Sequence, residues 1–270
     1  MLLIILNCDS KLLKLFGLKR ALNLKQNIIL KKSNKIYANT NIFLEENPYY
    51  KDKKLINISP AGLKGFYNLG TCVYISENYN LKDYIFSGVS AGSWNSLIMV
   101  NKGNSTRLAY ELINIAKKNQ DNKTIYELQC ELKRKLLKKY TSNDFYLKNI
   151  FMGVACFNKE RMVSNIYGDF ENLNDVIDCA IASSHIPFVT GKYINRYYNY
   201  ISFDGGITSN KYLNLKPSLT IHQDMWNLEY NEKDNFNPKK NNYTALFLKG
   251  YSDAEKNKDY LSSIFEKKID

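Results

Sequence analysis

The stretch YIFSGVSAGSWNSL, residues 84–97, carries the most informative pattern in the sequence. A β-like run ends in Gly-Val-Ser-Ala-Gly and becomes apolar again without an intervening loop, so a strand is expected to pass directly into a helix at Ser90. A serine between Gly88 and Gly92 at such a junction is typical of a nucleophile elbow, which exposes the serine oxygen on a sharp turn. The alternative is an ordinary tight turn with a small residue, because the pattern specifies only three of five positions.

Strand-like and helix-like runs alternate on both sides of this stretch. The expected strands are 55–59, 83–89, 150–158, 161–168, 197–203 and 218–222. A turn over 60–65 leads into helical spacing as far as residue 78, and further helices are expected at 91–103, 106–118, 124–140, 172–184 and within 252–268. Alternation of this kind predicts a layered α/β domain.

The charge of the chain is unevenly distributed. The net charge is +12 over 270 residues, and residues 1–44 hold eight Lys/Arg against the single acid Asp9. We therefore divide the chain into a basic N-terminal extension (1–50) and a main domain (51–270). A basic face favours an anionic partner, either a phospholipid surface or nucleic acid, and the alternative is a solvated basic surface. No nucleic-acid recognition motif is present, so nucleic acid is disfavoured.

The cysteines, the histidines and the hydropathy of the chain limit which classes of protein and of metal site are possible. Five dispersed cysteines without C-x-x-C spacing predict reduced thiols in an intracellular compartment, and two histidines make a histidine metal site improbable. We expect no metal and no cofactor. The run Leu2–Leu6 is too short to span a bilayer, and a transit peptide in the basic, acid-poor N-terminal region is a minor alternative.

Two further motifs suggest acyl-transfer chemistry. SPAGLKG (59–65) lies between a strand and a helix, where glycines let backbone N–H groups point at a developing oxyanion. Asp204 ends a β-like run and is followed by Gly205 and Gly206, so its carboxylate can act as a general base if burial raises its pKa. The alternatives are a packing turn or anion nest at 59–65 and a common Asp-Gly-Gly turn at 204–206. In a mainly parallel sheet, the carboxyl ends of strands share one edge, which would bring these motifs together.

The order of motifs resembles that of the patatin-like phospholipases. SPAGLKG, GVSAG, AIASSHIPFV and FDGG follow one another over about residues 55–225, and AGLKGFYNLG is similar to the branch that includes triglyceride lipases. The resemblance implies a three-layer α/β/α domain with a central, mainly parallel sheet, and a catalytic dyad of Ser90 as nucleophile and Asp204 as base. It implies an oxyanion hole built by the backbone around Gly62, Leu63, Lys64 and Gly65.

One departure affects the oxyanion loop. The family usually has three glycines there, whereas Pro60 and Ala61 occupy the first two places in this chain. Proline has no N–H, so only the later amides are able to serve.

The resemblance implies hydrolysis of fatty-acyl esters of membrane glycerolipids, phospholipid or neutral, by an enzyme peripheral to membranes. Two alternatives are a catalytically silent lipid-binding protein on the same scaffold and a serine esterase using a Ser90–Asp204–His222 triad. His185 is expected to be packed or solvated. Trp94 and Met99 are expected to pack in the core, with an acyl channel as the alternative.

Overall fold

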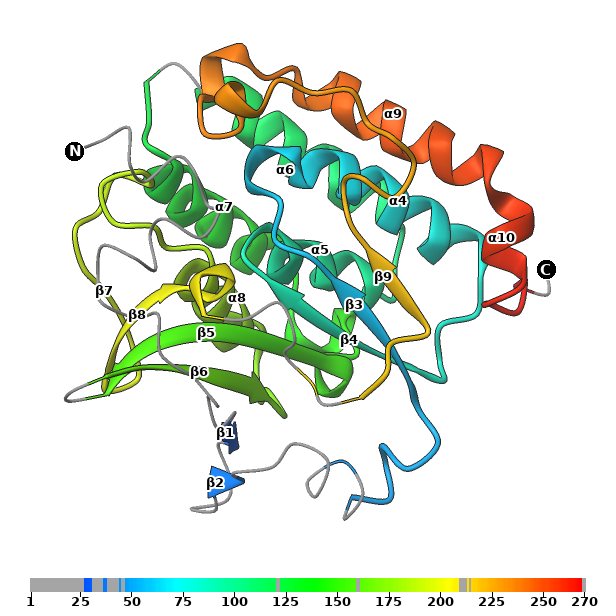
Figure 1. Cartoon of the computed structure of the whole chain (residues 1–270), viewed down its shortest axis with the longest axis horizontal. Helices are drawn as coiled ribbons and strands as arrows, with labels where there is room; N and C mark the ends of the chain where they lie inside the picture. Colours follow the sequence, from blue (N-terminus) through cyan, green and yellow to red (C-terminus); the bar gives the residue numbers. More distant parts are fainter. Residues whose placement is uncertain are drawn as a thin grey trace.

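The computed structural model describes residues 27–30, 36–37, 44, 47–119, 122–158, 161–208, 213 and 215–268. It shows a mixed α/β domain with helices packed against a mainly parallel sheet (Figure 1). The expected α/β class and mainly parallel sheet are confirmed, and the arrangement is compatible with three α/β/α layers.

The described part of the sheet contains nine strands, seven of which form one path in the order β2-β1-β6-β5-β4-β3-β9. The first five along the chain are β1 (Asn27–Leu30), β2 (Ile36–Tyr37), β3 (Lys54–Ile58), β4 (Tyr84–Val89) and β5 (Ile150–Asn158). The others are β6 (Arg161–Gly168), β7 (Asn195–Tyr197), β8 (Tyr200–Asp204) and β9 (Leu219–Ile221). Four of the six pairings along the path are parallel: β1–β6, β3–β4, β3–β9 and β4–β5.

The described helices from α4 onwards lie on one side of the sheet, some directly on the strands and others packed on those helices. They are α4 (Gly65–Asn78), α5 (Ala91–Met99), α6 (Ser105–Asn119), α7 (Ile125–Lys139), α8 (Leu173–Ser183), α9 (Tyr243–Lys256) and α10 (Lys258–Ser262). A short 3-10 turn, η1 (Gly62–Lys64), precedes α4. In Figure 1, α5 and α8 lie next to the strands, and α9 runs along the outer side of α4.

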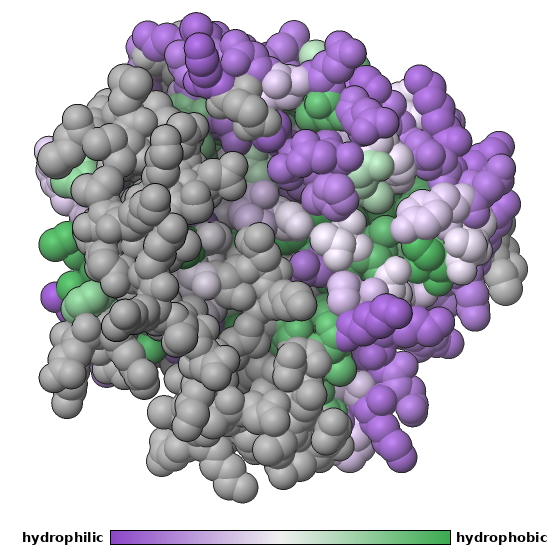
Figure 2. Space-filling view, in the orientation of Figure 1, coloured by the Kyte–Doolittle hydropathy of each residue, from purple (hydrophilic) through white to green (hydrophobic). Residues whose placement is uncertain are grey.

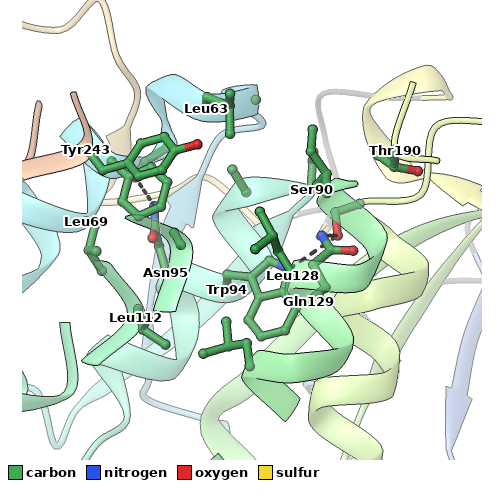
Figure 3. A pocket seen from close by; sticks show the side chains of 18 of the residues that line it. Leu63, Leu69, Ser90, Trp94, Asn95, Leu112, Leu128, Gln129, Thr190 and Tyr243 are labelled. Carbon is green, nitrogen blue, oxygen red and sulfur yellow. Dashed lines mark hydrogen bonds between the residues drawn. The ribbon is translucent and has the colours of Figure 1, made fainter. Parts of the chain in front are cut away.

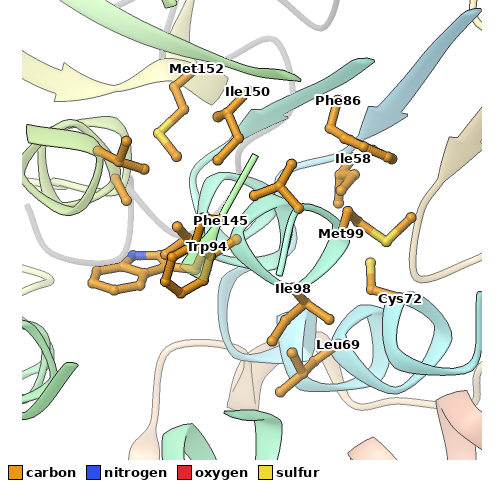
Figure 4. Close-up of a cluster of buried hydrophobic side chains, with 14 of the residues drawn as sticks. Ile58, Leu69, Cys72, Phe86, Trp94, Ile98, Met99, Phe145, Ile150 and Met152 are labelled. Atoms are coloured by element: carbon orange, nitrogen blue, oxygen red, sulfur yellow. The ribbon is translucent and has the colours of Figure 1, made fainter. Parts of the chain in front are cut away.

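Alternation along the strands explains why both faces of the sheet are buried. In β4, Tyr84 and Phe86 point to the helical face, whereas Ile85 and Val89 point to the opposite face. The larger core lies between sheet and helices, where Trp94 and Met99 pack with other apolar side chains (Figure 4). The smaller cluster on the other face includes Leu44, Tyr50, Phe151 and Leu213.

The sheet extends into the segment expected to form a basic extension. β1 pairs in parallel with β6, and β2 pairs with β1. Residues 27–30 and 36–37 therefore contribute backbone to the sheet of the domain. The possible targeting segment, residues 1–25, lies outside the described residues.

Two expected elements have different bounds. The run 197–203 is broken after Tyr197, where the chain turns, so β7 and β8 form an antiparallel pair. The terminal helix starts at residue 243, because the Asn242 side chain accepts the Ala245 N–H and caps it there.

Candidate active site

Ser90 sits on a strained turn between β4 and α5. Its backbone has φ 54° and ψ −126°, a combination that is unfavourable for a residue with a Cβ atom. Its N–H donates to the Ser183 hydroxyl (2.9 Å), and its carbonyl accepts from the Ser93 hydroxyl (2.6 Å). These bonds hold the strained backbone, so the local geometry is that of the predicted elbow rather than an ordinary tight turn.

Close contacts with neighbouring backbone atoms require glycine at both positions that flank Ser90, Gly88 and Gly92. A Cβ atom on Gly88 would lie 2.3 Å from the Gly92 carbonyl oxygen, and one on Gly92 would lie 2.2 Å from that of Ile58. Both glycines have ordinary negative φ, so their role is steric. They allow α5 to pack directly over the ends of β3 and β4.

The pairing of β5 with both β4 and β8 brings Asp204 close to Ser90. Residues 150–153 of β5 pair with β4 in parallel, and residues 154–157 pair with β8 in the antiparallel direction. The two strands therefore share one edge of β5 and meet head-on, with Val89 opposite Gly153 and Asp204 opposite Val154. The sequence-based reason, carboxyl ends of parallel strands, was wrong for Asp204, which ends an antiparallel strand.

The Ser90 side chain is a neighbour of the buried Asp204 carboxylate. The Asp204 Oδ1 atom accepts the Gly206 N–H (2.7 Å), and the Asp204 N–H donates to the His185 carbonyl (2.6 Å). Burial raises the pKa of Asp204 to about 6, and the Ser90 side chain and the bond from Gly206 oppose that increase. A carboxylate with this pKa is able to accept a proton from the serine near neutral pH.

The loop Gly62–Gly65 lies beside the elbow. A Cβ atom on Gly65 would be 2.5 Å from the Ala91 Cβ atom, and the Asn95 side chain donates to the Gly65 carbonyl (3.0 Å). Gly62 has φ +55°, which glycine tolerates. The predicted loop thus approaches the nucleophile as the motif order implied.

Two of the predicted oxyanion donors are occupied. The Leu63 N–H donates to the Asn235 backbone carbonyl (3.1 Å), and the Lys64 N–H donates to the Asn235 side-chain oxygen (3.1 Å). Asn235 belongs to the polar segment 231–242, which follows β9 and precedes α9. No sequence signal pointed to it, because Asn235 is 171 residues away from Lys64.

Ser90, Asp204 and the Gly62–Gly65 loop line one cavity of about 150 Å³ (Figure 3). Its walls are mostly apolar and come from α4 to α7 and from the segment after α8 (Leu69, Trp94, Leu112, Leu128, Leu132, Ile186). Trp94 both packs in the core and lines the cavity, whereas Met99 packs in the core and is not among the lining residues. An apolar cavity with a serine hydroxyl at its wall has the chemical character to hold an acyl chain.

The two histidines lie differently. His185 is buried, its Nδ1 atom contacts the Thr190 hydroxyl (3.3 Å), and burial lowers its pKa. Its backbone carbonyl fixes Asp204, which makes it a packed residue as expected. His222 follows β9 and is not among the residues that line the cavity.

Neighbours of the elbow that sequence reasoning had not assigned are Ser183 and Ser184. The Ser183 hydroxyl joins Ser90 to β5 by donating to the Gly153 carbonyl (2.6 Å). The Ser184 hydroxyl accepts from Trp94 and Gln129 in the cavity wall. Both serines lie in the AIASSHIPFV motif, which contributed to the family resemblance without a role being assigned to either serine.

A scan against models of protein families finds no match for this chain, and a search of curated proteins finds none either. Among the described residues, no cluster of three or more His, Cys, Asp or Glu side chains is arranged to hold a metal ion. In the same part of the chain, no helix combines the length and hydrophobicity needed to cross a bilayer. The four described cysteines are free thiols.

Proposed function

We propose that this protein is a lipid acyl hydrolase that cleaves fatty-acyl esters of membrane glycerolipids through a Ser90–Asp204 dyad. The observation that carries the proposal is the strained Ser90, which lines an apolar cavity together with the buried Asp204 carboxylate. The four motifs that resemble the patatin-like phospholipases support the same conclusion.

The chemistry proceeds in two half-reactions. Asp204 takes the hydroxyl proton as Ser90 Oγ attacks the ester carbonyl carbon, and the tetrahedral oxyanion collapses as the protonated alcohol leaves. Asp204 has by then passed its proton to the leaving alkoxide. Water attacks the acyl carbon as Asp204 takes a proton from the water. Asp204 returns this proton to Ser90 Oγ as the bond from Oγ to the acyl carbon breaks and the fatty acid leaves. Backbone N–H groups of the Gly62–Gly65 loop stabilise the negative charge in both steps.

The cavity recognises the acyl chain rather than the head group. Most lining side chains of α4 to α7 are apolar, with Asn95 and Gln129 as exceptions, and further polar groups include Ser90, Ser184 and Asp204. Phospholipid and neutral glycerolipid are therefore both proposed as substrates, presented at a membrane surface.

Labelling by a fluorophosphonate probe tests the mechanism. The wild type should label, and Ser90→Ala and Asp204→Asn should not, although both remain folded. Asp253→Asn is the matched control, because Asp253 is another buried acid, bonded to the Tyr67 hydroxyl away from the cavity. A folded wild type that resists labelling contradicts the proposed hydrolase.

The second candidate function is a catalytically silent lipid-binding protein. It is favoured by the hydrogen bonds that Asn235 accepts from the Leu63 and Lys64 amides. It is also favoured by Pro60, which stands where the patatin-like family usually has a glycine of the oxyanion loop. Binding of a long-chain fatty acid in the cavity without serine labelling would support it. The His222 triad, a third possibility, has no supporting contact among the described residues.

A further inference from the structure

Exposed apolar side chains are concentrated after α8. Of the eleven large apolar or aromatic side chains that are exposed in the described residues, four fall within residues 188–198: Phe188, Tyr193, Ile194 and Tyr198. Their exposed fractions lie between 45% and 71%, so core packing does not account for them. Figure 2 shows green, hydrophobic residues at the left margin, over the region where Figure 1 places β7.

The same segment is continuous with the wall of the cavity. Ile186 and Thr190 line the cavity, and Phe188, between them, points outward and packs edge-on against Tyr193 (5.1 Å between ring centroids). Phe188 has φ +66° and Tyr198 has φ +49°, which is costly for bulky residues. Strain in exposed aromatic residues indicates a role outside the folded core.

The charge of this segment fits an anionic surface. Residues 186–200 contain Lys192 and Arg196 and no acid. Lys192 bonds the Tyr126 hydroxyl, and Arg196 is exposed. The acids in the adjacent polar pocket are Asp175, which accepts from the Tyr197 hydroxyl, and Asp178, which pairs with Lys133. Tyrosine and phenylalanine beside lysine and arginine are favoured at the boundary between lipid head groups and acyl chains.

We propose that segment 186–198 docks the protein on an anionic phospholipid bilayer, with Phe188, Tyr193 and Ile194 inserted and Arg196 at the head groups. The proposal deepens the proposed hydrolase function, since docking here places the cavity wall against the lipid. A second copy of this chain or another protein is the competing occupant.

Vesicle co-sedimentation of the full chain carrying Ser90→Ala tests this surface without turnover. Phosphatidylcholine vesicles with and without phosphatidylserine are the probes. Phe188→Ser/Tyr193→Ser/Ile194→Ser should lower the partition constant roughly tenfold or more, because the inserted apolar area is lost. Arg196→Gln should reduce the enhancement by phosphatidylserine. The control is Leu248→Ser/Tyr260→Ser, which removes equally exposed side chains (51% and 52%) from α9 and α10.

Unchanged partitioning of the triple variant, or an equal loss in the control, overturns the docking surface. A concentration-dependent dimer that the triple variant abolishes, without vesicle binding, assigns the surface to a second copy and also overturns it. In the Ser90-containing protein, the triple variant should hydrolyse a soluble short-chain ester as the wild type does. A wild type without ester hydrolysis whose Ser90→Ala form still binds vesicles refutes the hydrolase and leaves docking intact.

A different observation carries a second inference. Both oxygens of Asn235 accept from the amides that would hold the oxyanion, and the next residue, Phe236, lines the cavity. The contact is tight, because a Cβ atom on Gly62 would lie 2.8 Å from Asn235 Oδ1. The two Asn235 oxygens therefore take the hydrogen bonds that a tetrahedral oxyanion would need from the same two amides.

We infer that Asn235 is an autoinhibitory latch that must leave the Leu63 and Lys64 amides before acyl transfer. This inference also rests on the proposed hydrolase. Asn235→Ala frees the Lys64 N–H and removes one anchor of the segment, so fluorophosphonate labelling of Ser90 should accelerate roughly fivefold or more. Asn237→Ala is the control, because Asn237 bonds within the same segment, to the Lys239 N–H, and not to the Gly62–Gly65 loop.

Equal or slower labelling of Asn235→Ala than of wild type, with the control unchanged, overturns the latch and leaves the hydrolase standing. A wild type that resists labelling while Asn235→Ala labels supports both. If none of the folded proteins labels, the hydrolase itself is refuted, together with the latch.

Discussion

The two halves of the candidate site are held by different kinds of structure. Ser90 and Asp204 are fixed at the meeting point of β4 and β8 on one edge of β5, within buried backbone. The oxyanion loop is a 3-10 turn, and its Leu63 and Lys64 amides are satisfied by Asn235 from a partly exposed segment. The part of the site that contains Ser90 and Asp204 is therefore preorganised. The loop that contains the Leu63 and Lys64 amides is held by hydrogen bonds to Asn235, which another acceptor is able to replace.

Under the proposed mechanism, this difference would combine a rigid nucleophile with a releasable contact at the oxyanion loop. Displacing Ser90 or Asp204 requires breaking strand pairing in the core, which is costly. Displacing Asn235 requires breaking two hydrogen bonds at the edge of the cavity, which a substrate oxyanion can replace.

The largest expected effect comes from removing the rigid half. Ser90→Ala should lower hydrolysis of a soluble ester by roughly a thousandfold or more, and Asp204→Asn should do nearly the same, because the two groups act as a unit. Ester turnover by protein with unchanged circular dichroism measures this effect. Residual activity within tenfold of wild type in either variant would place the nucleophile elsewhere.

The pH profile sharpens the assignment of Asp204 as base. Only the ionised carboxylate accepts the Ser90 proton, so activity is present above the pKa and is lost as pH falls through it. With burial raising that pKa to about 6, kcat/KM should fall about tenfold per pH unit below 6 and level off above it. A profile that breaks near pH 4 would instead indicate an exposed, ordinary carboxyl group.

Backbone approach at the elbow is expected to matter for stability. Gly92→Ala places a Cβ atom 2.2 Å from the Ile58 carbonyl oxygen and should lower the free energy of unfolding by about 2–4 kcal/mol. Urea denaturation measures the loss. Gly103→Ala is the matched control, since its Cβ atom would have no neighbour closer than 3.7 Å. Equal stability of the two variants would contradict the packing described here.

The smallest expected effect separates the dyad from a triad. His222→Ala should change kcat/KM for a soluble ester by less than about twofold, because His222 does not line the cavity. A loss of a hundredfold or more would restore the Ser90–Asp204–His222 alternative. Steady-state kinetics near neutral pH decides between them.

Much of this protein follows from the sequence alone. The β-like run into Gly-Val-Ser-Ala-Gly predicted the elbow, because a strand period followed at once by a helix period leaves only a sharp turn between them. The alternating strands and helices predicted the α/β class, which is confirmed. The motif order predicted that the Gly62–Gly65 loop, Ser90 and Asp204 would converge.

The tertiary structure decided the features that depend on distant segments. Asp204 meets Ser90 because β4 and β8 share one edge of β5, a pairing that no local pattern encodes. Asn235 binds the oxyanion-loop amides from 171 residues away. Periodicity and motifs report only on neighbours along the chain, whereas hydrogen bonds and strand register join residues that are distant in sequence. The sequence therefore predicted the local geometry at Ser90 and at the Gly62–Gly65 loop, but not which distant residues contact them.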